Sequence, residues 1–157
     1  MEFAHQRHRE TFERVEEYLQ ELFEETYVED GHFYVTYGST VLEISIESYG
    51  PEDASVGIIA YCVQGADIDD ELLSGLLQLN HTLAFGAFSV VGADIFFAHS
   101  LFGRTLERSN LLSAIAAVAE TADLYDDKIV EKYGGKRAFD AIRGTGGRRA
   151  RRQSVEN

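Results

Sequence analysis

Apolar positions along the chain follow two different periods, and the change between them separates helices from strands. Near the N-terminus, apolar residues recur at spacings of three and four, which predicts one stripe of a helix over residues 7–26. The stripe comprises Phe12, Val15, Leu19, Leu22 and Phe23. The opposite face carries glutamates, which form either a solvated face or a docking surface for a basic partner. These glutamates are Glu10, Glu13, Glu16, Glu17, Glu21, Glu24 and Glu25.

From His32 onward the period is two, which predicts a hairpin around Gly38–Thr40. Its apolar positions are Phe33, Val35, Tyr37, Leu42, Ile44 and Ile46. After a turn over Tyr49–Ser55, the run Val56–Gln64 is apolar at both sets of alternating positions. We therefore expect a third strand whose two faces are both covered, one by helices and the other by something else.

A short helix follows this strand. Asp69 or Asp70 is suited to cap its N-terminus, and it ends near Gly86. Its apolar positions are Leu72, Leu73, Leu76, Leu77 and Leu79.

The rest of the apolar pattern predicts two strands around the turn Gly92–Asp94 and a long helix over Thr105–Tyr133, which Gly134 and Gly135 end. The element order is thus α-β-β-β-α-β-β-α. We expect an α+β fold in which helices flank a twisted antiparallel sheet. We expect residues 1–135 to form a single domain. Residues 136–157 are a basic tail that is expected to be disordered, because its last part, residues 144–157, lacks apolar content.

The charge divides the chain in the same place. The formal net charge is −13 over 157 residues. Residues 136–157 hold seven Lys or Arg against two acidic residues, a net charge of +5, which leaves −18 for residues 1–135. Because phosphate repels an acidic surface, nucleic acid could bind only through the tail. Its arginine cluster is Arg148, Arg149, Arg151 and Arg152.

Length and composition favour a cytoplasmic protein. The first ten residues lack the apolar core of a signal peptide, and no apolar run approaches the roughly 20 residues of a membrane span. The single cysteine, Cys62, excludes an internal disulfide and suits a reducing compartment.

The residues that carry chemistry do not form a catalytic or metal-binding pattern. Cys62 lies inside a predicted strand, where thiols are usually inert. The acidic run Asp67–Glu71 lacks the glycine and distal glutamate of a calcium loop, and His5 and His8 have no further ligand at suitable spacing. We expect no catalytic residue, no metal and no cofactor.

Aromatic residues are the stronger signal. Those of the last two strands fall on both alternating faces, so helices on one side alone would leave some of them exposed. A partner subunit or a bound polypeptide segment would cover them. The expected surface comprises Tyr61, Phe85, Phe88, Phe96, Phe97 and Phe102.

With its leucine-rich middle helix running into "LNHTLAFGAFSVV" and its last helix closing on "ADLYDDKIVEKYGG", the chain resembles the YbjN-like family over residues 7–135. This family shares its fold with the type III secretion chaperones, and its members have been labelled sensory-transduction regulators. The resemblance implies a small acidic homodimer that holds a segment of another polypeptide, without catalysis.

We therefore expect a protein-binding module, either chaperone-like or a regulatory adaptor. In the alternative, the basic tail carries the function, and it binds a polyanion such as nucleic acid or folds back over the acidic body.

Overall fold

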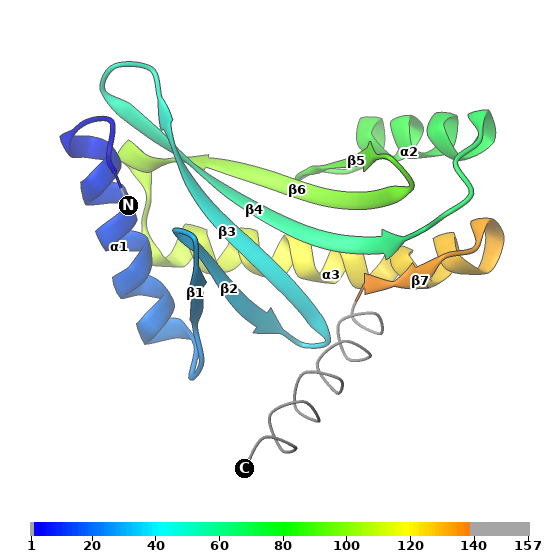
Figure 1. Ribbon diagram of the computed structural model, residues 1–157, viewed down its shortest axis with the longest axis horizontal. Coiled ribbons are helices and arrows are strands. Elements are labelled where there is room, and N and C mark those ends of the chain that lie inside the picture. The colour runs from blue at the N-terminus through cyan, green and yellow to red at the C-terminus, as the bar shows by residue number, and fades with distance from the viewer. Residues whose placement is uncertain (1, 139–157) are drawn as a thin grey trace, which may run out of the picture.

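The computed structural model describes residues 2–138 and confirms the α+β fold of helices and an antiparallel sheet (Figure 1). Residues 139–157, with the arginine cluster of the tail, lie outside the described part. The helices and strands are α1 (Gln6–Leu22), β1 (Tyr27–Glu29), β2 (His32–Tyr37), β3 (Thr40–Tyr49), β4 (Asp53–Gln64), α2 (Asp70–Thr82), β5 (Ala87–Val91), β6 (Asp94–Phe102), a 3₁₀ turn η1 (Gly103–Thr105), α3 (Arg108–Tyr133) and β7 (Lys136–Arg137).

Six strands follow one another across the sheet in the order β1-β2-β3-β4-β6-β5, and every pair is antiparallel. The long central strand β4 pairs with β3 on one side and β6 on the other. The short strand β7 pairs with the end of β4, opposite Val63 and Gln64. A β-bulge between Tyr61 and Val63 shifts the register there, so Cys62 and Val63 are buried in succession.

One face of the sheet forms the core. Val56, Ile58 and Ala60 alternate along β4 with their side chains fully buried. The helix α3 crosses the sheet on this side, and α1 packs at its β3 end (Figure 1). The covered face also contains Phe33, Ile44 and Phe97 from β2, β3 and β6. The apolar stripes of the helices pack against these alternating apolar residues of the strands, so both patterns in the sequence arise from one core.

The helix α2 lies along the edge strand β5 and is fixed to it by a side chain. Asn80 Oδ1 accepts from the backbone N–H of Phe88 (2.7 Å), and Asn80 Nδ2 donates to the Phe88 carbonyl (3.1 Å). The amide thus forms the two hydrogen bonds that a neighbouring strand would form, and it satisfies the backbone N–H and carbonyl of Phe88 on the outer edge of β5. The connection to β5 passes through Gly86 at φ +76°, where a Cβ atom would lie 2.6 Å from the Phe97 ring.

The structure differs from the sequence pattern at the end of α1 and in two short strands that the pattern does not predict, β1 and β7. The strand β7 occupies the first two residues of the segment 136–157 that was expected to be disordered. The helix α1 ends at Leu22, not at residue 26, because Phe23 is extended and the chain turns to pair β1 with β2. Glu24 and Glu25 are good helix formers, but this strand pairing overrides their propensity. The strand β1 escaped prediction because all three of its residues are exposed and show no burial alternation.

Candidate functional site: the open face of the sheet

The face of the sheet opposite α3 is the candidate site, and we call it the open face. Along β4 its residues are Ser55, Gly57, Ile59 and Tyr61, each half-buried. Among the described residues no helix packs against this row, whereas the alternate row of β4 lies under α3. The sequence predicts cover on both faces of this strand, and the described part of the chain supplies cover on one.

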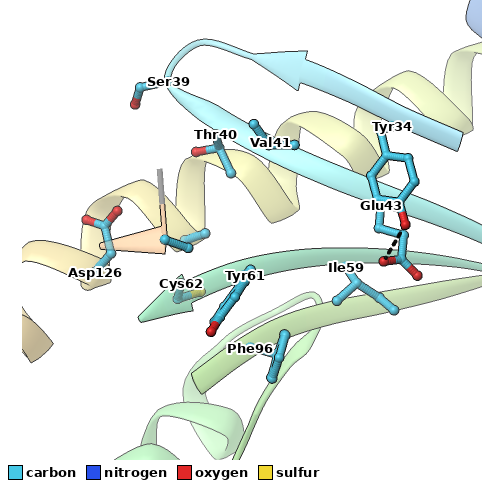
Figure 2. A pocket seen from close by; sticks show the side chains of 12 residues that line it. Tyr34, Ser39, Thr40, Val41, Glu43, Ile59, Tyr61, Cys62, Phe96 and Asp126 are labelled. Atoms are coloured by element: carbon cyan, nitrogen blue, oxygen red, sulfur yellow. Dashed lines mark hydrogen bonds between the residues drawn. The ribbon is translucent and has the colours of Figure 1, made fainter. Parts of the chain in front are cut away.

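An aromatic pair dominates one end of the open face. Tyr61 on β4 and Phe96 on β6 are cross-strand partners, and their rings stack with centroids 4.8 Å apart and an interplanar angle of 19°. Ile59 lies next to them on the same face (Figure 2). Such a pair presents a flat apolar surface that is already ordered before a partner arrives.

Beside this pair lies a pocket of about 170 Å³ that opens from the face toward α3. The β3–β4 ladder ends at Leu42 and Ala60, and the β7–β4 ladder begins at Val63, so the pocket fills the interval between β3 and β7. Its walls are Tyr34, Ser39, Thr40, Val41, Glu43, Ile59, Tyr61, Cys62, Phe96, Ala122, Asp126 and Ala138 (Figure 2).

Two carboxylates stand on different sides of this pocket. Glu43 accepts from the Tyr34 hydroxyl (3.3 Å) and lies 2.6 Å from His32 Nδ1, which holds it in place (Figure 2). Asp126 comes from α3, and its desolvation by burial raises the pKa of its carboxyl to about 6. The pocket therefore combines apolar rings with negative charge, an arrangement that suits a cationic side chain.

The remaining titratable groups of the pocket are poor nucleophiles. Burial raises the pKa of the Cys62 thiol to about 12, with a further contribution from the nearby Asp126 charge. The pKa of Tyr61 is also raised to about 12, mainly by desolvation and then by its hydrogen bond to Asp94. Both groups stay protonated at neutral pH, and no cluster of three or more potential metal ligands occurs within residues 2–138.

A second aromatic pair occupies the other end of the open face. Tyr49 and Phe102 are both exposed, their ring centroids are 5.8 Å apart, and the Arg104 guanidinium lies 5.2 Å from the Phe102 ring. Between the two aromatic pairs, β4 and β6 carry Gly57, Ser100 and Ala98 on this face, together with the larger Ile59 next to Tyr61. At Gly57 a Cβ atom would lie 2.8 Å from Ser45 Oγ, so the serine side chain already occupies the space beside the glycine. The middle of the open face is therefore a shallow surface.

The aromatic residues selected from the sequence separate into three groups. Tyr61, Phe96 and Phe102 lie on the open face, and Phe85 is exposed in the connection between α2 and β5. Phe88 and Phe97 are instead core residues, 6% and 0% exposed, because they alternate onto the face that the helices cover. These two side chains are unavailable to a partner in this fold.

The other polar residues considered in the sequence have structural roles. Asp69 caps α2 by accepting from the Leu72 backbone N–H (2.8 Å). His5 caps α1, and His8 Nε2 lies 3.1 Å from the Ile46 carbonyl oxygen, which joins the helix to β3.

Sequence reasoning missed Tyr34, Glu43 and Tyr49 on the open face, and Asp126 of α3 in the wall of the pocket. Alternation within the first hairpin places Tyr34 and Glu43 opposite the apolar row, but only the strand register brings them together as a pair. No local signal in the sequence connects Asp126 of α3 with β3 and β4.

Comparisons with known proteins agree with this geometry. The model of a family described as "T3SS (YopN, CesT) and YbjN peptide-binding chaperone 1" matches residues 10–141. A solved structure titled "Structure of the HopA1-SchA Chaperone-Effector Complex" contains a chain with the same fold, at a TM-score of 0.57 and 15% identity over 74% of this chain and 94% of that one. The comparison with curated proteins finds no match. Within residues 2–138, no helix has the length and apolar content needed to span a membrane.

Proposed function

The chain belongs to the family of T3SS and YbjN peptide-binding chaperones, and we propose that it holds an extended segment of another polypeptide on the open face. The resemblance to the YbjN-like family in the sequence is thereby confirmed. The observation that carries the proposal is a sheet face that bears two ordered aromatic pairs and that no described helix covers.

The spacing of the aromatic pairs fits an extended client. Tyr61 and Ser55, which pair with Phe96 and Phe102 of β6, are six residues apart on β4. At a rise of about 3.3 Å per residue the two pairs are separated by roughly 20 Å. A client segment of about six extended residues would place an apolar side chain on each pair, while the shallow centre accommodates its backbone.

The role requires binding without catalysis, and the raised pKa of Cys62 supports it because the protonated thiol is unreactive. The free, buried cysteine also suits a reducing cytoplasm, which is where we place the protein. A regulatory adaptor would use the same face. Both the chaperone-like role and the regulatory role therefore depend on binding of a polypeptide segment to the open face.

We also propose that the protein is a homodimer that forms through α2 and β5. Leu73 and Leu77 lie one helical turn apart on α2 and are 38% and 70% exposed, and Val91 of β5, the strand that α2 contacts, is exposed as well. A second copy would remove these side chains from water and leave the open face free. Leu77→Glu should convert the dimer to monomer in sedimentation velocity, and a monomeric wild-type protein would contradict the dimer.

The peptide-binding proposal is tested by panning a library of random extended peptides against the full-length protein and measuring the enriched peptides by fluorescence anisotropy. Ile59→Asp places a charge between the aromatic pairs and should weaken binding at least ten-fold. The matched control is Leu124→Asp, at an exposed position on the outer side of α3, which should leave binding unchanged. Equal affinity of the Ile59→Asp and wild-type proteins would exclude the open face as the binding site.

A further inference from the structure

The described chain ends in the wall of the pocket. Pairing of Lys136 and Arg137 with Gln64 and Val63 of β4 fixes the direction of the chain. Ala138, which follows, is 2% exposed and lines the pocket together with Tyr61 and Asp126. The described part of the chain therefore ends at the pocket, and 19 further residues of the sequence follow Ala138.

The charge of this segment complements that of the pocket. Residues 139–157 contain five arginines and two acidic residues, a net charge of +3. On the other side, Glu43 and Asp126 line the pocket, and Asp123 stands at its rim, where its Oδ1 accepts from the Ser39 hydroxyl (3.0 Å).

The aromatic rings add a second attraction for arginine in particular. Tyr34, Tyr61 and Phe96 surround the space between the two carboxylates. A guanidinium group stacks on such rings while it donates to carboxylate oxygens, whereas a lysine ammonium offers no plane to stack. The pocket, about 170 Å³, has room for one long side chain.

The length of the segment allows the contact. Nine residues lie between Ala138 and Arg148, and three of them are glycines, Gly144, Gly146 and Gly147. An unstructured chain of nine residues would have a root-mean-square span of roughly 15–18 Å. Because Ala138 itself lines the pocket, a segment of this length is long enough for its arginines to turn back to the pocket. Tethering would give them an effective concentration near the millimolar range.

We propose that the arginine-rich segment Arg148–Arg152 of this chain docks into the pocket between Glu43 and Asp126, with a guanidinium group stacked on Tyr61 or Phe96. The segment then occupies part of the open face and competes with a client there. This competition rests on the proposed function, but the docking itself does not, because it involves only this chain.

The docking is measured in the full-length protein with a nitroxide label at Ser154→Cys. Cys62 does not react with the label because its buried thiol stays protonated. The Ile59 methyl signals should lose several-fold more intensity than those of Leu112, near the start of α3, and about 0.5 M salt should restore them, because the Debye length then falls to roughly 4 Å. Replacing Arg148, Arg149, Arg151 and Arg152 with Gln should likewise restore the intensity of the Ile59 methyl signals.

Two matched variants separate the pocket from acidic surface in general. Glu43→Gln with Asp126→Asn removes two carboxylates from the pocket and should abolish the broadening at Ile59. Glu13→Gln with Glu17→Gln removes two exposed carboxylates from α1 and should leave it unchanged.

Three outcomes would overturn the proposal: broadening centred on α1, broadening only when labelled and unlabelled copies are mixed, or no broadening with the segment instead binding a single-stranded oligonucleotide. Failure of docking with intact peptide binding would reject this inference alone. Loss of peptide binding by Ile59→Asp has no bearing on docking measured without a client.

Discussion

The two faces of β4 have similar sequences and opposite roles. Ile58 and Ile59 are adjacent in the chain, yet Ile58 is fully buried under α3 and Ile59 is half-buried on the open face. On the neighbouring strand β6, Phe97 lies in the core and Phe96 stacks on Tyr61 at the surface. The comparison shows that an apolar residue in this sheet does not reveal by its type whether it supports the fold or contacts a partner.

The largest effect that separates the faces should come from truncating these two phenylalanines. Phe97→Ala removes a fully buried ring and should lower the free energy of unfolding by about 3–5 kcal/mol. Phe96→Ala removes a ring that remains partly hydrated and should cost about 1 kcal/mol or less, while it weakens peptide binding. Urea denaturation of both variants measures the difference, and equal losses would show that the open face is covered in solution.

Two glycines sharpen the same comparison at a smaller scale. Gly86→Ala combines φ +76° with a Cβ atom 2.6 Å from the Phe97 ring on the covered face, so we expect a loss of roughly 2 kcal/mol. Gly57→Ala meets only the Ser45 hydroxyl on the open face, which can rotate away, and should cost less than about 1 kcal/mol. Thermal unfolding of the two variants should give the larger decrease in Tm for Gly86→Ala; the reverse order would contradict the assignment of the faces.

The smallest effect is a pH dependence at the pocket, where the open face meets α3. Asp126 faces Asp123, Asp127, Arg137 and Cys62, and burial raises its pKa from 3.8 to about 6. A raised carboxyl pKa stabilises the fold below pH 3.8, and this contribution is lost as the pH rises through about 6.

Asp126→Asn should therefore stabilise the protein at pH 7 and have little effect near pH 4. The measurement is urea denaturation at both values, in the protein whose four tail arginines are replaced with Gln, so that no docked cation offsets the effect. A stabilisation that is the same at both pH values would contradict the titration of Asp126.

The sequence pattern predicted best those helices and strands that are buried on one face, because their apolar residues recur with one period. The stripe of α1, the first hairpin and the long α3 were predicted, because a helix or strand buried on one side repeats every 3.6 or two residues. The N-cap of α2 was narrowed to Asp69 or Asp70, and the structure shows that it is Asp69. The end of α1 and the strand β1 were not predicted, since pairing with β2 determines both. The bond of Asn80 to the Phe88 backbone of β5 was not predicted either, because it joins two elements whose contact the sequence pattern does not show.

By itself, the sequence determined the family, the α+β fold, the order of the elements other than β1 and β7, and the division between an acidic body and a basic tail. Period and charge are local properties of the chain, so they can be read without knowing which elements meet. Only the tertiary structure decided that Phe97 is core and Phe96 is surface, and that Glu43 of β3 and Asp126 of α3 share one pocket with Tyr61. Alternation gives a strand two faces, but which of them a distant helix covers depends on packing between segments far apart in the chain.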